Sequence, residues 1–242
     1  MKFKKYSATD AHRTTQITGN KSHETPLKHL QTKTPASTLT FNRRIDRDED
    51  SVVRVLRAYT RYKDGSMDEA KLTTEDECCL VVSAGIVGVT VLYPGEFFGW
   101  DDAAIFLSKV LEKPVFSFHI HDGDLWMYVL YENGEAVDQF NPMPDYWQEL
   151  DDDERQTWKG NASEIACRIP GISPEQITRY LIQWGDDVFE SEERKKAYPT
   201  DDFFYGDDWQ LVDFMRKLGF DFPLDDHGTP RGVTFQFKYD SN

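Results

Sequence analysis

The residues of this chain best suited to chemistry lie in the stretch 115–140, VFSFHIHDGDLWMYVLYENGEAVDQF. His119 and His121 are one residue apart, and Asp124 follows an Asp-Gly dipeptide. On a strand, residues i and i+2 point to the same side of the sheet. Imidazole and carboxylate groups together are ligands that zinc and other divalent metals accept. One hypothesis is therefore a metal-dependent hydrolase with His119, His121 and Asp124 as its metal ligands.

The same stretch also predicts a three-stranded meander. Asp-Gly at 122–123 and Asn-Gly at 133–134 are the dipeptides preferred in two-residue hairpin turns, because both central residues need positive φ. The first turn alone would then account for the two acids, Asp122 and Asp124, that follow the histidines. The metallohydrolase pattern His-x-His-x-Asp-His is absent, and so is the Glu that follows a cupin His-x-His. We therefore favour a cross-strand pair of His121 and Asp124 and expect no cofactor.

Two-residue turns would also fix the strand register, with His121 opposite Asp124 and His119 opposite Trp126. One face of the meander would then be almost entirely apolar and would pack on the core. The other face would be polar and aromatic, and a ligand or partner would rest on it. Its central residues would be His119, His121, Trp126 and Tyr128.

A second constellation is the stretch YPTDDFFYGDDWQL at 198–211, in which acids alternate with aromatic residues. At a protein interface, aromatic side chains supply contact area and acids select a basic partner. The partner-binding residues would be Asp202, Phe204, Tyr205 and Asp207. The alternative is structural: Phe203 and Phe204 would pack before the last helix, and one of the two acids at 207–208 would cap it. Both interpretations stay open here.

Charge is distributed unevenly along the chain of 242 residues. The net charge is -15, yet residues 1–48 hold ten Lys and Arg against four Asp and Glu. The rest of the chain then holds eighteen Lys and Arg against thirty-nine Asp and Glu. A body this acidic repels nucleic acid and attracts basic surfaces. We therefore expect a basic protein partner and no nucleic acid.

Composition indicates a cytoplasmic protein with one core. Hydrophobic residues make up 39% and aromatic residues 14% of the chain, enough for a sizeable core. Neither a membrane-spanning apolar run nor a secretory signal is evident. The three cysteines, Cys78, Cys79 and Cys167, do not suggest a disulfide framework.

The elements along the chain predict an α+β fold. Residues 1–48 are expected to be a disordered basic tail, and residues 49–242 a single acidic domain, sheet-rich over 49–141 and mainly helical over 142–242. An antiparallel sheet with the meander would be packed by helices. Its other elements would be a helix beginning near 49, a hairpin of 78–83 and 86–93, helices over 101–112, 173–185 and 208–219, and a strand over 233–238.

Two segments, LYENGEAVDQFNPMPDYW and KAYPTDDFFYGDDWQLVDFMRKLGF, resemble segments of an uncharacterised bacterial protein family. The resemblance covers residues 115–220 and implies a natural module without a known catalytic residue. Phosphate-loop, nucleophile-elbow and dinucleotide-binding motifs are missing from the chain. We therefore expect a non-enzymatic protein-binding module, such as an acidic inhibitor or immunity-type protein that acts on a basic partner.

Overall fold

The computed structural model describes residues 37–42, 48–95, 97–190 and 193–239. Its strands are β1 (Ser37–Asn42), β2 (Ser66–Glu69), β3 (Cys79–Ala84), β4 (Gly88–Leu92), β5 (Val115–His121), β6 (Leu125–Glu132), β7 (Glu135–Phe140) and β8 (Val233–Lys238). Its α-helices are α1 (Asp48–Tyr62), α2 (Trp100–Leu111), α3 (Asp152–Thr157), α4 (Ala162–Ala166), α5 (Asp186–Glu190) and α6 (Gln210–Lys217). Two short 3₁₀ helices are η2 (Pro174–Gln176) and η3 (Thr178–Tyr180).

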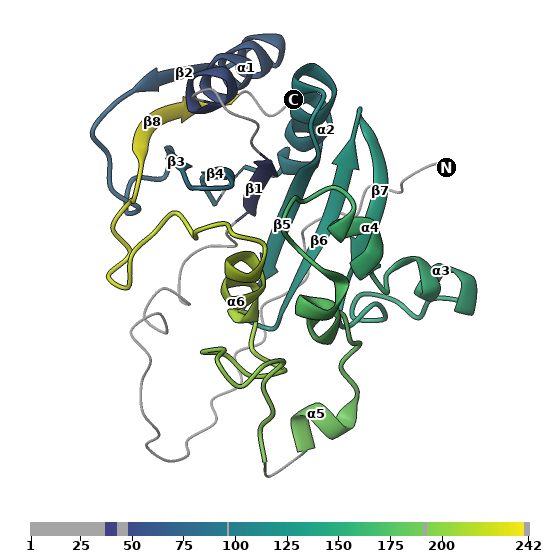
Figure 1. The fold of residues 1–242 in the computed structure, drawn as a ribbon. Coiled ribbons are helices and arrows are strands. Elements are labelled where there is room, and N and C mark those ends of the chain that lie inside the picture. The colour runs from purple at the N-terminus through teal and green to yellow at the C-terminus, as the bar shows by residue number, and fades with distance from the viewer. Residues whose placement is uncertain (1–36, 43–47, 96, 191–192, 240–242) are drawn as a thin grey trace.

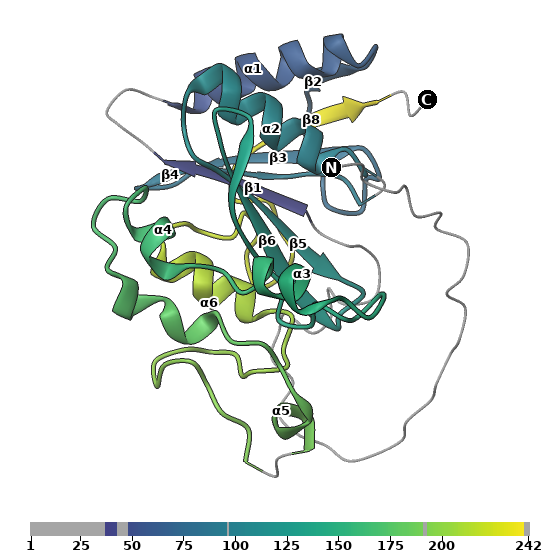
Figure 2. The ribbon, with the colours of Figure 1, turned by 90° about the vertical axis from the view of Figure 1, so that its right-hand side faces the viewer.

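The strands form one eight-stranded sheet in the order β2-β8-β3-β4-β1-β5-β6-β7 (Figure 1). Every neighbouring pair is antiparallel. Helices α1 and α2 cover one face of the sheet, and α4 and α6 lie on the other side (Figure 2). This arrangement confirms the α+β class and the antiparallel meander.

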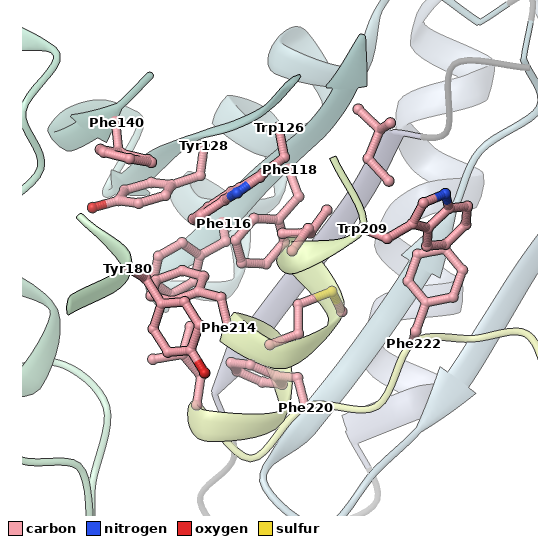
Figure 3. Packing of buried hydrophobic residues seen from close by; sticks show 14 of the residues in the cluster. Phe116, Phe118, Trp126, Tyr128, Phe140, Tyr180, Trp209, Phe214, Phe220 and Phe222 are labelled. Carbon is pink, nitrogen blue, oxygen red and sulfur yellow. The ribbon is translucent and has the colours of Figure 1, made fainter. Parts of the chain in front are cut away.

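The sheet separates two hydrophobic clusters. On the α1 and α2 side, Leu56 and Leu107 pack with Val115 of β5. On the other side, Phe118 of β5 packs with Phe214 of α6 (Figure 3). Because side chains alternate along a strand, β5 supplies apolar residues to both clusters and is buried from both sides.

Most locally encoded elements of the first two thirds of the chain are confirmed. The helix expected near 49 is α1, the helix expected over 101–112 is α2, and the hairpin is the β3–β4 pair. The last strand is also confirmed as β8, with Phe235 and Phe237 buried. It pairs with β2 on one side and β3 on the other, so the end of the chain returns to the sheet.

The N-terminal segment differs from the expectation at residues 37–42. These residues form β1 between β4 and β5, so the expectation of disorder is wrong for them. The partners of β1 lie far along the chain, and a local hydrophobic period does not reveal such long-range pairing. Residues 1–36 and 43–47 of the expected tail lie outside the described residues.

The C-terminal part is less helical than expected. In place of a helix over 173–185, the chain forms η2 and η3, and Ile177 between them leaves helical geometry with φ -127°. The expected capping box of Ser173 and Gln176 is present. Ile177, Tyr180 and Trp184 are buried. Their spacing therefore predicted correctly that these side chains are buried, but it did not correspond to a continuous helix. Short helices and loops fill the rest of this part before β8.

Candidate functional site

The hairpin of β5 and β6 has a different register from the predicted one. His119 pairs with Met127, and His121 pairs with Leu125. Asp122 and Gly123 adopt positive φ, and the His121 carbonyl accepts a hydrogen bond from the Asp124 amide, as in the expected turn. Asp124 is nevertheless left out of the strand pairing, and this one extra residue shifts the register of β6 by one.

A shift of one residue moves every side chain of β6 to the opposite face of the sheet. Trp126 and Tyr128 are fully buried in the cluster on the α6 side, where both rings pack on Phe214 (Figure 3). They therefore do not share a face with His119 and His121. The predicted polar and aromatic sheet face is corrected: it is divided between the two sides of the sheet.

On their own side, the two histidines belong to a line of aromatic side chains that runs from one loop to another. The His119 ring stacks on the Trp100 indole with centroids 4.8 Å apart, and Trp100 contacts Phe98 at 5.9 Å. The His121 ring lies 5.8 Å from His119. It also lies 5.4 Å from the Tyr146 ring and 5.0 Å from the Trp147 ring. We call these six residues the aromatic row: Phe98, Trp100, His119, His121, Tyr146 and Trp147.

The two ends of the aromatic row are open to solvent. Phe98 is 65% exposed at one end, and Trp147 is 51% exposed at the other. His119, in the middle, is only 7% exposed. The row is therefore anchored by buried His119 and presents exposed rings at both ends.

Two carboxylates lie beside the His121 and Tyr146 rings of the aromatic row, and further acids follow in the sequence. The Tyr146 hydroxyl donates a hydrogen bond to Asp124, and Asp122 Oδ2 lies 3.6 Å from His121 Nε2. Six acids follow in and around the same loop, with Arg155 as the cation that pairs with Asp145 at 2.9 Å. We call the following eight residues the acidic rim: Asp122, Asp124, Asp145, Glu149, Asp151, Asp152, Asp153 and Glu154.

Burial decides the protonation of two members of the row. Desolvation, followed by the neighbouring His121, lowers the pKa of His119 to about 4. His119 is therefore neutral at neutral pH and behaves as an aromatic ring. Partial burial, followed by the hydrogen bond to Asp124, raises the pKa of Tyr146 to about 12. Its hydroxyl stays protonated and remains a donor.

The three proposed metal ligands do not form a metal-binding group in this structure. Among the described residues, no group of three or more His, Cys, Asp and Glu side chains could hold a metal ion. Asp124 accepts the Tyr146 hydroxyl, and the carboxylate beside His121 belongs to Asp122. The geometry thus directs these side chains to one another and to aromatic neighbours.

The acidic and aromatic stretch at 198–211 contacts cations of its own chain. Asp207 pairs with Arg194 at 2.6 Å, and the same guanidinium lies over the Phe204 ring. The Tyr205 hydroxyl donates a hydrogen bond to a backbone carbonyl at 2.7 Å. Asp202 is exposed and pairs with Arg216 at 3.0 Å. Their roles in partner binding stay a prediction.

The structural alternative for this stretch is correct in part. Phe203 is buried, whereas Phe204 is half-buried. Helix α6 begins after Trp209, and no side chain caps it. Asp207 instead closes the preceding turn, where its carboxylate accepts the Phe204 amide.

Four members of the aromatic row escaped the sequence analysis, which found only the two histidines. Phe98 lies in the loop before α2, Trp100 is the first residue of α2, and Tyr146 and Trp147 come from the loop before α3. A local signal existed, since each pair stands beside acids, in FFGWDD and in PDYWQELDDD. No rule based on period could join two loops that are nearly fifty residues apart.

No family model, no curated protein and no solved structure matches this chain significantly. Within the described part of the chain, no helix is long and apolar enough to cross a membrane. The functional conclusion therefore depends on the aromatic row, the acidic rim and the charge of the chain.

Proposed function

We propose that this protein is a non-enzymatic binding module that holds a basic partner protein on the aromatic row and its acidic rim. One observation carries the proposal: exposed rings stand at both ends of a connected aromatic row, and Asp122 and Asp124 lie beside one end of it. Aromatic residues are enriched at the centres of protein interfaces, and charged residues are more common at their edges. The net charge of -15 favours a partner of opposite sign.

The row and the rim suit Lys and Arg side chains of the partner. A cation placed over an exposed Trp or Tyr face is attracted by the ring, and Arg does this most often. Trp147 and Tyr146 offer such faces. Carboxylates of Asp122 and Asp124 beside them would take the remaining donors of a guanidinium. Long-range attraction by the acidic rim would speed the encounter, and salt would slow it.

The role that we propose is that of an inhibitor or immunity-type protein. Such a protein has to cover a basic surface and needs no catalytic group of its own. The aromatic row would provide the contact area, and the acidic rim would provide the specificity for a basic surface.

The test is affinity capture from the native cell extract with the immobilised full chain. We expect a basic protein to be retained at low salt in a stoichiometric amount and to be released at high salt. Trp147→Ala and the double variant Asp122→Asn, Asp124→Asn should not retain it. Tyr62→Ala is the matched control, because Tyr62 is 72% exposed on α1 and lies outside the row.

Binding of the captured partner is then measured with purified proteins. Trp147→Ala should raise the dissociation constant by about 30-fold or more if this ring is a hot spot. Equal retention by wild type and both variants would contradict the proposal. So would a retained partner with an acidic surface.

A further inference from the structure

A cavity of about 330 Å³ lies beside α6 and shares no residue with the aromatic row or the acidic rim. Its wall comes from three parts of the chain: α6, the loop 196–203 and the loop 220–231. Ligand sites in proteins are typically cavities of this size, with an apolar lining and a few polar groups. The acidic and aromatic stretch at 198–211 contributes Asp202 and Phe203.

Apolar side chains form one part of the cavity wall, and charged side chains form the rest. Phe203, Phe220, Phe222 and Leu224 line it and are themselves largely buried. Val212 of α6 adds a half-buried side chain. This surface would receive an apolar side chain of a ligand and remove it from water.

The rim of the cavity carries both signs of charge. Arg216 is already engaged, at 3.0 Å from Asp202 and 2.8 Å from the buried Asp213. By contrast, Arg231, Asp221 and Asp226 make no ion pair with any described residue. A guanidinium and two carboxylates thus face the same cavity with unused charge.

The loop that carries Asp226 and Arg231 is held by its own hydrogen bonds. The Asp225 carboxylate accepts the amides of His227 at 2.9 Å and Thr229 at 2.8 Å. The Arg231 amide donates to the Pro223 carbonyl at 2.9 Å. The backbone positions of the two charges are therefore fixed before any ligand arrives, which lowers the entropy cost of binding.

We propose that this cavity binds an α-amino acid or a short peptide with an apolar side chain. The ligand carboxylate would pair with Arg231, and its ammonium group with Asp226 and Asp221. The side chain would lie against Phe203, Phe220 and Phe222. Because the exposed rim carries charges of both signs, a zwitterion can form charge-assisted hydrogen bonds with both kinds. This inference is independent of the proposed docking of a basic partner.

The test is titration calorimetry of the full chain with L-phenylalanine, L-leucine and the dipeptide Phe-Leu. We expect saturable one-to-one binding, and the tighter ligand decides between a free amino acid and a peptide. L-Phenylalanine methyl ester lacks the carboxylate, and N-acetyl-L-phenylalanine lacks the ammonium group. Each should bind about tenfold more weakly than L-phenylalanine, because one charged hydrogen-bonding group is lost. Glycine, which has no side chain, should not bind measurably.

Two variants assign the ends of the ligand. Arg231→Gln should weaken the binding of L-phenylalanine by about tenfold and leave the binding of the methyl ester unchanged. Asp226→Asn should weaken the binding of L-phenylalanine and leave the binding of the N-acetyl derivative unchanged. Arg61→Gln, an exposed change on α1, is the matched control and should bind like wild type. Absence of saturable binding for all three ligands, equal binding of glycine, or wild-type binding by both variants would overturn the proposal.

Discussion

The imidazole of His119 stacks on the indole of Trp100, with the ring planes 21° apart. Trp100 begins α2 and His119 lies in β5, so the contact joins a helix to the sheet that it covers. Burial in this contact lowers the pKa of His119. At neutral pH the two rings form an uncharged centre for the aromatic row.

The first prediction concerns the stability of this centre in acid. The pKa of His119 is about 4 in the folded protein, against 6.5 for an unperturbed histidine. Between these pH values the unfolded chain binds more protons, so His119 makes stability fall as the pH drops from 6.5 to 4. The loss from this residue is about 2 to 3 kcal/mol. His119→Phe keeps a ring and removes the titration.

Urea denaturation at several pH values between 4 and 7 measures this effect. The free energy of unfolding should fall less in His119→Phe than in wild type over this range. Comparison of the two proteins cancels the groups that they share. Parallel curves for variant and wild type would contradict the prediction.

The second prediction concerns Asp208, which is buried two residues before α6 begins. Burial, followed by the nearby Asp207, raises its pKa from 3.8 to about 6. Here the folded protein binds more protons between these pH values, so this residue makes stability fall as the pH rises from 4 to 6. Asp208→Asn should therefore increase the free energy of unfolding at pH 7 by about 1 to 3 kcal/mol.

The measurement is again denaturation as a function of pH. The difference between Asp208→Asn and wild type should be small at pH 4 and largest above pH 6. Asp68→Asn, a change of the same kind at an exposed position of β2, is the control. A gain that is already complete at pH 4 would show that the charge of Asp208 is not its cause.

The third prediction tests the hydrogen bond between Tyr146 and Asp124. Tyr146→Phe should cost about 0.5 to 1.5 kcal/mol of unfolding free energy, since it removes the donor and leaves the ring. Asp124→Ala combined with Tyr146→Phe should cost less than the sum of the single changes, because each change removes one partner of the same hydrogen bond. Chemical denaturation of wild type, the two single variants and the double variant measures this coupling. Strictly additive losses of unfolding free energy would contradict the prediction.

The fourth prediction concerns Phe214, on which the cluster between α6 and the sheet is centred. This fully buried ring contacts Phe118, Trp126, Tyr128 and Tyr180. Phe214→Ala should destabilise the protein by about 3 to 5 kcal/mol, because it removes buried area and leaves a cavity. Phe189→Ala, at a residue that is 53% exposed, should change stability by less than about 0.5 kcal/mol. Thermal unfolding of both variants and wild type measures these changes in stability.

The sequence alone predicted the elements whose information is local. Helices α1 and α2 followed from apolar spacing, and the turns at 122–123 and 133–134 followed from residues that tolerate positive φ. Strand β8 followed from alternation. Each of these depends on neighbours within a few residues, so a pattern in the chain is enough to reveal it.

Only the tertiary structure decided which faces and which distant segments meet. The extra residue Asp124 changed the register of β6 and buried Trp126 and Tyr128 on the side opposite to His119. Long-range pairing made β1 a central strand, and the start of α2 and the loop before α3 brought Trp100 and Trp147 to the histidines. Local propensity cannot fix a register, because a slip of one residue keeps the same strand and reverses its faces. The packing of both clusters selects the one register in which each strand buries its apolar side chains.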